Sequence, residues 1–373
     1  MIDRSKTHEV MARQTHDDLA RAEFIVGLKR DLRALSKGNA TAYAKRIEPD
    51  FKAKNGRAPG TVAEIGAEME RQPYYRLWSA LNRTAQDMMW QAVESTIDHD
   101  LPRMLDAAER LTRGRNKMGS LELDPDFTPP PDLLVANIHC QPGGYMREDW
   151  AGDIKAGALY ESGGNIYSLG TGIGAKDSKA GAVIKFLADR HPDFRPSRIL
   201  DLGCSAGGAS VGYAAHFPDA EVHAVDAGPA ILRYAHARAE ALGVAVHFHQ
   251  MDVGALKFAE GDFDLVVSHN VMHEISVATL ARMLAESHRV LRPGGIALHQ
   301  DVPIKGDRTL FERYMFSWET RNNNEPFWEV FAEANVGALM KAAGFAEGSI
   351  VETQIPKLDG PGAWYVAMGA KSA

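Results

Sequence analysis

A short apolar run that breaks into a glycine-rich turn constrains the fold more than any other stretch of this chain. Arg198-Ile-Leu-Asp-Leu202 has the pattern of a buried strand, and Gly203-Cys-Ser-Ala-Gly-Gly208 follows it and leads into a helical pattern. A strand that ends in glycines and feeds a helix N-terminus predicts a site for a nucleotide-like ligand, because the helix start offers free N–H groups. Gly203 and Gly207 carry no side chain that would keep the backbone away from that ligand.

A carboxylate at the end of the next predicted strand supports the same interpretation. That strand ends in Asp226, about 20 residues after the glycine turn, where an acid can bond to a ribose hydroxyl. Strand and helix patterns then alternate to the end of the chain, which predicts an α/β fold with a doubly wound sheet. The predicted strands are residues 198–202, 221–226, 244–250, 263–268, 296–301, 349–354 and 364–368.

Residues 1–120 carry no strand signal and are predicted to form an all-helical N-terminal domain. Their apolar residues recur at helical spacing, above all in residues 73–111, which are rich in Trp, Met and Tyr. So large an apolar surface must be covered by something. Two interpretations stay open: a plain helical bundle, or a domain that dimerises or covers a substrate.

Residues 121–177 are predicted to be a linker and a cofactor-covering segment, ahead of a sheet domain over residues 178–373. Pro and Gly are frequent in this segment, and the aromatic residues Trp150, Tyr160 and Tyr167 come shortly before the glycine turn. These aromatic side chains are expected to fold over the mouth of the ligand site. Packing among the loops is the alternative.

Composition narrows the class of partner. The net charge is −7, whereas a protein with a broad nucleic-acid surface is normally basic. No uncharged run approaches the roughly 20 residues that a membrane helix needs, and the first residues lack the apolar core of a secretion signal. Two cysteines, Cys140 and Cys204, cannot form a disulfide framework. We expect a cytoplasmic protein with no nucleic-acid or membrane partner.

Four motifs in order give the chain a family resemblance: Asp201-Leu-Gly-Cys-Ser-Ala-Gly207, the acidic end of the second strand, Met251-Asp-Val253 and Val290-Leu-Arg-Pro-Gly-Gly295. Over residues 178–373 the chain resembles class I S-adenosylmethionine-dependent methyltransferases, most of all small-molecule O-methyltransferases with a helical N-terminal domain. The resemblance implies a seven-stranded Rossmann-like sheet, with S-adenosyl-L-methionine as cofactor and S-adenosyl-L-homocysteine as product. Ser205 departs from the pattern, because the family most often has glycine there.

The same resemblance implies which residues hold the cofactor. Asp201 holds the methionine ammonium, directly or through water, and Asp226 accepts hydrogen bonds from both ribose hydroxyls. Asp252 accepts from the adenine amino group, while Val253 offers its backbone N–H to the ring. The other expected contacts are Gly203, Ser205, Gly207, Ala227 and Ser268. A dehydrogenase is the rival interpretation, but it favours Gly-x-Gly-x-x-Gly, and Ser205 takes the middle position.

Residues 269–274 follow the fourth strand and are expected to face the transferred methyl group or its acceptor, because ligands lie beyond the carboxyl ends of the strands. Enzymes that methylate DNA bases or amides carry Asn or Asp before Pro-Pro and an aromatic residue here, and this chain does not. His273 is predicted to be a general base that deprotonates a hydroxyl or thiol, with Glu274 beside it and His269 as the next candidate. A histidine that only packs near the cofactor is the alternative.

The acceptor pocket is expected to draw on Phe311 to Trp328, between strands five and six. Aromatic residues alternate there with arginines and three asparagines, which suits recognition of an anionic or hydrogen-bonding molecule. Core packing with a helix cap is the alternative. The predicted substrate contacts are Tyr167, Asn270, Arg313, Trp318 and Arg321. No metal is expected, because no compact group of His, Cys, Asp and Glu has the spacing of a ligand set.

The predicted activity is methyl transfer from S-adenosylmethionine to an oxygen or sulfur of a small metabolite. Two alternatives stay open: methylation of nitrogen or carbon, in which positioning matters more than a base, and a non-catalytic protein that only binds the cofactor. The N-terminal helices are expected to form a homodimer.

Overall fold

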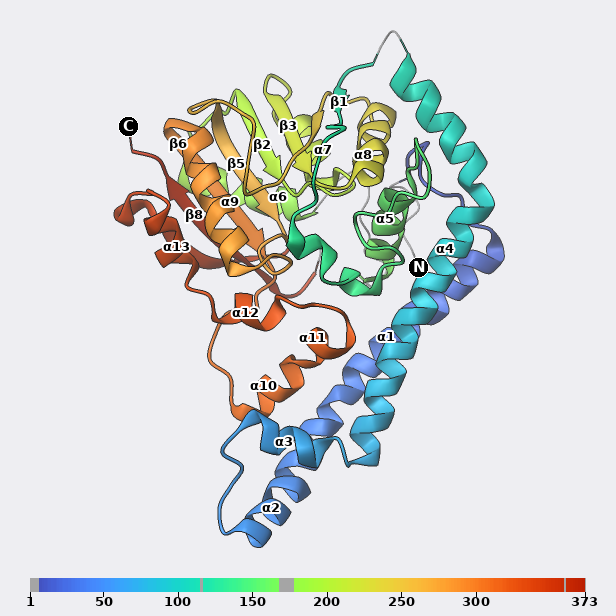
Figure 1. The fold of residues 1–373 in the computed structure, drawn as a ribbon, viewed down its shortest axis with the longest axis vertical. Helices are drawn as coiled ribbons and strands as arrows, with labels where there is room; N and C mark the ends of the chain where they lie inside the picture. Colours follow the sequence, from blue (N-terminus) through green and yellow to red (C-terminus); the bar gives the residue numbers. More distant parts are fainter. Residues whose placement is uncertain (1–6, 115–116, 168–177, 359, 373) are drawn as a thin grey trace.

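The protein consists of an α/β domain and a long helical hairpin that runs along its side (Figure 1). The hairpin is made of α1 (His16–Ala42) and α4 (Pro73–Arg113), which pack against each other. Its far end carries α2 (Glu48–Asn55) and α3 (Val62–Met69), well beyond the sheet (Figure 1). The computed structural model describes residues 7–114, 117–167, 178–358 and 360–372.

The α/β domain is built on one sheet of eight strands in the order β1-β4-β3-β2-β5-β6-β8-β7. Neighbouring strands are parallel except where β8 pairs with β6 and β7. All seven strands expected from the sequence are present. Their bounds are β2 (Arg198–Leu202), β3 (Glu221–Asp226), β4 (His247–Gln250), β5 (Phe263–His269), β6 (Leu291–Asp301), β7 (Val351–Pro356) and β8 (Ala363–Ala370).

The eighth strand, β1 (Ser120–Glu122), corrects the expected number of seven. It begins where the sequence predicts the boundary between the helical domain and the linker. Ser120 pairs with His247 of β4, and its hydroxyl oxygen lies 2.9 Å from His247 Nδ1. Three residues are too few to show an alternating pattern in the sequence. Their pairing supplies the hydrogen bonds that the edge of β4 would otherwise lack, so the chain between the two domains is anchored to the sheet.

The parallel strands end together, and polar residues stand at their ends. Asp201 in β2 lies opposite Ala224 of β3 and Val267 of β5. In the same register, Asp226 closes β3 opposite Gln250, and His269 closes β5 opposite Gln300. Because ligands of an open α/β sheet bind beyond the carboxyl ends of its strands, this edge is where the functional site is expected.

Helices cover both faces of the sheet. Residues alternate between the faces, so that Ile199 packs with one cluster of buried side chains and Leu200 with the other. Every residue of β5 is buried, as expected for a central strand covered on both sides. The covering helices are α6 (Ser178–Arg190), α7 (Gly208–His216) and α8 (Pro229–Ala241) on one face and α9 (Val277–Val290) and α13 (Val336–Ala342) on the other.

Three short helices connect the sheet to the far end of the hairpin (Figure 1). They are α10 (Leu310–Phe316), α11 (Trp318–Asn322) and α12 (Trp328–Glu333). Tyr314 and Trp318 pack with buried residues of α3 and α4, among them Tyr75. The segment predicted to wall the acceptor pocket therefore also forms one of the apolar contacts between the two parts of the protein.

A buried ion pair joins α5 (Lys155–Tyr167) to α8. Glu161 of α5 is fully buried and accepts a hydrogen bond from Arg238 Nε at 2.9 Å. The hydroxyl of Tyr234 donates to the same carboxylate, and His8 Nε2 lies 2.8 Å from it. Arg238 also donates to the carbonyl oxygen of Gly207 at 3.2 Å. The pair therefore connects the N-terminal segment and α5 to the glycine turn.

Replacing Glu161 with Gln should destabilise the protein, because Arg238 would keep its charge in the interior without a carboxylate. Loss of one partner of a buried pair costs about 3–5 kcal/mol in the free energy of unfolding. The matched control is Glu148→Gln. Glu148 pairs with Arg233, which lies on α8 like Arg238 but near the surface. That substitution should cost about 1 kcal/mol or less. Urea denaturation at neutral pH measures both, and equal losses would contradict the assignment.

The contribution of Glu161 should also depend on pH. Burial alone would raise the pKa of its carboxyl, but Arg238 and His8 lower it from 4.5 to about 2. Because the folded state then binds this proton more weakly than the unfolded state, the contribution is complete above about pH 4.5 and is lost as the pH falls towards 2. The stability difference between the wild type and Glu161→Gln should therefore shrink when the denaturation is repeated at pH 3.

Candidate functional site

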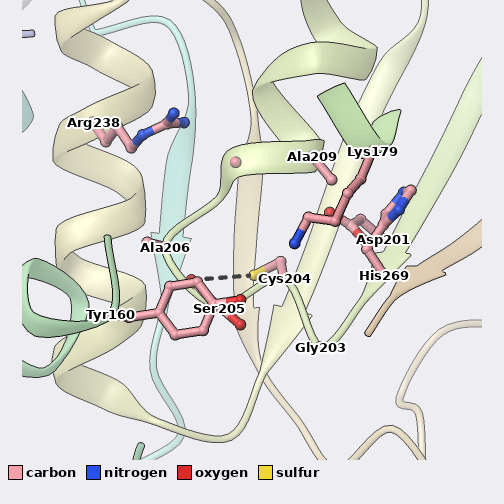
Figure 2. A pocket seen from close by; sticks show the side chains of 11 residues that line it. Tyr160, Lys179, Asp201, Gly203, Cys204, Ser205, Ala206, Ala209, Arg238 and His269 are labelled. Carbon is pink, nitrogen blue, oxygen red and sulfur yellow. Dashed lines mark hydrogen bonds between the residues drawn. The ribbon is translucent and has the colours of Figure 1, made fainter. Parts of the chain in front are cut away.

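Two pockets meet at the glycine turn that follows β2. One encloses about 380 Å³ and is lined by Asp201, Lys179 and His269, among others. The other encloses about 660 Å³ and extends along the ends of β3 and β4. Gly203, Ser205 and Tyr160 line both pockets, so the two form one elongated site. Figure 2 shows the first pocket, with Tyr160 beside Ser205 and with Lys179, Asp201 and His269 on the other side of the turn.

The backbone of the glycine turn is left-handed at three places. Gly203 has φ +67° and Gly207 has φ +73°. A Cβ on Gly203 would lie 2.6 Å from Val271 Cγ2, so glycine is required there for space as well as conformation. Ser205 has φ +49°, which explains why glycine is usual at this position in the family that the chain resembles. Its N–H donates to Asp226 Oδ2 at 2.8 Å, and this bond helps to hold the strained residue.

The larger pocket has the side chains that a nucleoside would need. Asp226 and Ala227 line it at the end of β3, and Asp252 and Val253 line it after β4. The N–H of Gly228 donates to Asp226 Oδ1 at 3.1 Å, and burial raises the pKa of this carboxyl. We propose that Asp226 receives the ribose hydroxyls and that Asp252 and Val253 bind the base.

The smaller pocket is lined by Asp201, the third carboxylate expected to contact the cofactor, and by His269, the second candidate for the general base. Asp201 Oδ2 accepts a hydrogen bond from Ser210 Oγ at 2.6 Å. The ring of His269 is held on both sides, because Nε2 lies 3.0 Å from the Tyr213 hydroxyl and Nδ1 lies 3.0 Å from Gln300 Oε1. Tyr213 and Gln300 therefore fix the orientation of the His269 ring. We propose that this half of the site takes the methionine portion of the cofactor.

Two residues expected to contact the cofactor, Gly207 and Ser268, are not among the residues that line the two pockets. Gly207 precedes α7, and its left-handed backbone starts that helix. Ser268 is buried in β5, where its hydroxyl lies 2.9 Å from Nδ1 of His299 on the neighbouring strand. Asn270 does line the larger pocket, with a left-handed backbone at φ +57°.

Beyond the pockets lies a cluster of histidines and carboxylates that includes His273. His273 Nδ1 lies 2.5 Å from Asp301 Oδ1, and both side chains are buried. On the other side of the ring, Nε2 lies 3.7 Å from Glu274 Oε1. Glu274 lines the larger pocket and accepts a hydrogen bond from the Tyr145 hydroxyl at 3.1 Å. The predicted base therefore stands next to the pocket, with Glu274 between them.

His139 and Glu325 complete this cluster from two other segments. His139 Nδ1 lies 2.5 Å from Glu325 Oε1, and its Nε2 lies 3.5 Å from Glu274 Oε1. One potential ligand atom each from His139, His273 and Glu325 lies within 4.8 Å of the others. The sequence showed no ligand set because the three residues come from separate parts of the chain. The structure thus brings together potential ligands that the spacing along the chain does not reveal.

The charges in the cluster are strongly coupled. Burial would lower the pKa of His273, but the carboxylate of Asp301 outweighs it and raises the pKa to about 9. Burial also opposes protonation of His139, while Glu325 raises the pKa of that ring well above its ordinary value. The carboxylates therefore favour the protonated form of both rings. A neutral imidazole at His273, as a general base requires, is disfavoured in this state.

The backbone at His139 is strained and is held by α4. His139 has φ +56° and Cys140 has φ +58°, an uncommon conformation for residues other than glycine. The carbonyl oxygen of His139 accepts from Gln86 Nε2 at 2.6 Å and from Trp90 Nε1 at 2.7 Å. Arg83 donates to Cys140 Sγ and to the carbonyl of Asn322. Side chains of the helical hairpin thus fix the position of a residue in the site.

The predicted substrate residues divide into two groups. Tyr167 lies near the cluster, with its ring 5.1 Å from that of His139. Arg313 pairs with Glu333 at 2.7 Å on an exposed surface. Trp318 donates to Ser79 Oγ at 2.8 Å, and Arg321 pairs with Glu70 at 3.1 Å. These last three connect α10 and α11 with neighbouring helices, which is the packing alternative that the sequence left open.

The structure adds Asp301, His139 and Glu325 to the site. Asp301 could have been expected, because it ends the strand beside β5 at the same edge of the sheet. His139 stands in the predicted linker and Glu325 follows three asparagines, and neither belongs to a motif.

In the part of the chain that the structure describes, no helix is long and apolar enough to cross a membrane.

Residues 199–295 match a family described as a methyltransferase domain. A demethylmenaquinone methyltransferase of Thermus thermophilus is 37% identical over 123 residues, which are 32% of this chain and 55% of that protein. A malonyl-[acyl-carrier protein] O-methyltransferase of Dechloromonas aromatica is 35% identical over 111 residues, or 30% of this chain and 38% of that protein. The chain thus spans about half of the first relative and less of the second.

The similarity to solved structures is weaker than the similarity in sequence. Phosphoethanolamine N-methyltransferase 2 of Haemonchus contortus, in complex with S-adenosyl-L-methionine, has a TM-score of 0.38 and 17% identity, covering 51% of this chain and 52% of that one. The sequence match is the stronger finding, and it spans the glycine turn, Asp226 and the strand that ends at His269. The α/β domain of this chain is therefore a class I S-adenosylmethionine-dependent methyltransferase domain, with S-adenosylmethionine as its cofactor.

Proposed function

We propose that the whole protein transfers a methyl group from S-adenosylmethionine to an oxygen or sulfur of a small metabolite. The partly buried cluster of His139, His273, Glu274 and Glu325 beside the cofactor pocket carries this proposal. A hydroxyl or thiol must lose its proton to become a good nucleophile, and such a cluster offers places for that proton. Methylation of nitrogen or carbon depends more on positioning and gives less reason for these side chains.

The cofactor supplies a methyl group on a positively charged sulfur, and that methyl carbon bonds to the acceptor as its bond to sulfur breaks. Asp226 and Asp252 orient the nucleoside end, and Asp201 faces the methionine end. Asp301 fixes the ring of His273 so that Nε2 faces Glu274. Because the raised pKa of His273 disfavours its neutral form, we propose that the cluster as a unit, rather than His273 by itself, takes the proton of the acceptor.

The covering of the site supports a small acceptor. Pro130, Leu133 and Tyr145, from the segment expected to cover the cofactor, line the larger pocket. Tyr167 and Asn323 lie next to His139, and the Tyr167 hydroxyl lies 3.4 Å from Asn323 Oδ1. One relative is by its name an O-methyltransferase, which agrees with this proposal.

Asp226→Asn should weaken cofactor binding, because the amide replaces a charged acceptor of ribose hydrogen bonds. A hydrogen bond to a charged group contributes about 1.5–3 kcal/mol, so the dissociation constant of S-adenosylhomocysteine should rise roughly 10- to 150-fold. Isothermal titration calorimetry measures this constant. Asp219→Asn makes the same chemical change on an exposed loop and should leave the constant unchanged. An equal effect of both substitutions would remove Asp226 from the cofactor site.

His273→Gln should lower turnover by about 100- to 10,000-fold while S-adenosylhomocysteine binds as before, because proton transfer is impaired and the cofactor pocket is intact. Formation of S-adenosylhomocysteine is followed with a panel of small phenols, carboxylic acids and thiols. The control is His99→Gln, an exposed histidine of α4. Unchanged turnover in His273→Gln would favour the N- or C-methylation alternative. Absence of wild-type turnover on the whole panel would favour a non-catalytic protein.

We also propose that the helical hairpin forms a homodimer. Large apolar side chains on α1 and α4 are exposed: Phe24 is 59%, Leu35 is 48% and Leu77 is 61% accessible. A second copy of the hairpin would remove this surface from water. Phe24→Glu combined with Leu77→Glu should give a monomer of 40.8 kDa, whereas the wild type has about twice that mass in light scattering after gel filtration. A monomeric wild type would refute the dimer.

A further inference from the structure

Three separate segments bring together the donor atoms of a metal site. His139 lies in a short helical turn, Ile138–Cys140, while His273 follows β5 and Glu325 lies between α11 and α12. One potential ligand atom of each lies within 4.8 Å of the others. Ligand atoms around a tetrahedral zinc ion at 2.0–2.1 Å lie about 3.4 Å apart, so small side-chain movements would close this set around an ion.

The residue types favour a transition metal over magnesium or calcium. Two imidazoles with one carboxylate form the usual protein ligand set of a catalytic zinc ion, which keeps a fourth position open. A histidine that binds a metal through one ring nitrogen usually forms a hydrogen bond through the other. In His273, Nδ1 lies 2.5 Å from Asp301 Oδ1, and this contact turns Nε2 towards the cluster. A carboxylate behind a histidine fixes the ring and strengthens it as a ligand.

Glu325 gives a second reason to expect a cation. It is buried, and its Oε2 has no hydrogen-bond partner among the residues that the structure describes. Leaving a carboxylate oxygen unpaired in the interior is costly unless a charge or a metal ion compensates for it. The other oxygen of this carboxylate lies 2.5 Å from His139 Nδ1, so the unpaired atom belongs to the cluster itself.

We propose that His139, His273 and Glu325 bind one divalent zinc ion, with its open coordination position directed to the acceptor. Its role in turnover rests on the function proposed above, whereas binding of the ion does not. The acceptor hydroxyl or thiol would bind the ion and give its proton to Glu274, which lines the cofactor pocket. The lone pair of the resulting anion then attacks the methyl carbon, and the electron pair of the broken carbon–sulfur bond returns to sulfur.

The test is zinc binding by the full-length protein after chelator treatment, measured by calorimetry with zinc chloride and without cofactor. One zinc ion per chain is expected. Glu325→Gln and His139→Asn should weaken binding more than Asp301→Asn, for which the loss of a partner outside the ligand set predicts about a 10- to 100-fold effect. Asn is chosen at position 139 because it tolerates the left-handed backbone found there.

The matched control is His223→Gln, which removes a buried histidine of β3 that lies 3.0 Å from a second histidine, His249. It should bind zinc like the wild type. Circular dichroism and S-adenosylhomocysteine affinity establish that each variant is folded, and Glu325→Gln, the substitution of nearly equal volume, decides the matter if His139→Asn does not fold. Cobalt(II) absorption typical of tetrahedral coordination should appear in the wild type and the control only.

The possible outcomes separate the two proposals. Zinc that binds equally well to Glu325→Gln and His139→Asn is an adventitious ion only, and this result, or no zinc binding at all, overturns the metal site. Methyl transfer by the zinc-free wild type would leave the proposed function standing without the ion. Zinc binding that depends on the three residues in a protein that methylates nothing would keep the site and remove the function.

Discussion

The parallel pairing of β2 with β3 and β5 is the constraint on which the rest of the site depends. It places Asp201, Asp226 and His269 at one edge of the sheet, although they are far apart in sequence. The segments that follow these strands reach a ligand at that edge. The covering segment before the sheet also lines the pocket there, through Tyr145 and Tyr160. The helical hairpin takes part by holding another segment at the same place. It does so through Gln86 and Trp90, which hold the carbonyl of His139.

The cofactor half of the site could be predicted from the sequence because its requirements are local. A left-handed backbone and a close approach demand glycine at Gly203, and these needs are visible in a few residues. Asp226, the carboxylate at the end of β3, could be predicted for the same reason. The strands were also predictable, because buried parallel strands are continuous apolar runs. β1 was missed, since three residues that pair with an edge have no pattern of their own.

The acceptor half could not be predicted in the same way. His139, Glu325 and Asp301 meet only when the hairpin, the covering segment and the α11–α12 connection have packed, and no local pattern records that contact. The aromatic segment from Phe311 to Trp328 combines the two roles that its composition left open. Glu325 stands in the cluster beside the pocket, whereas Trp318 and Arg321 connect helices and cover the apolar end of α3 and α4.

The anchoring of the linker through β1 has a consequence for how the chain assembles during synthesis. Ser120 and His247 are separated by 127 residues, and Glu161 and Arg238 by 77. When α1 and α4 leave the ribosome, the strand and helix against which the following segment packs have not yet been made. The hairpin can form early because α1 and α4 pack against each other, but β1 and α5 must wait for α8 and β4. The acceptor side, which needs Glu325, is completed later still.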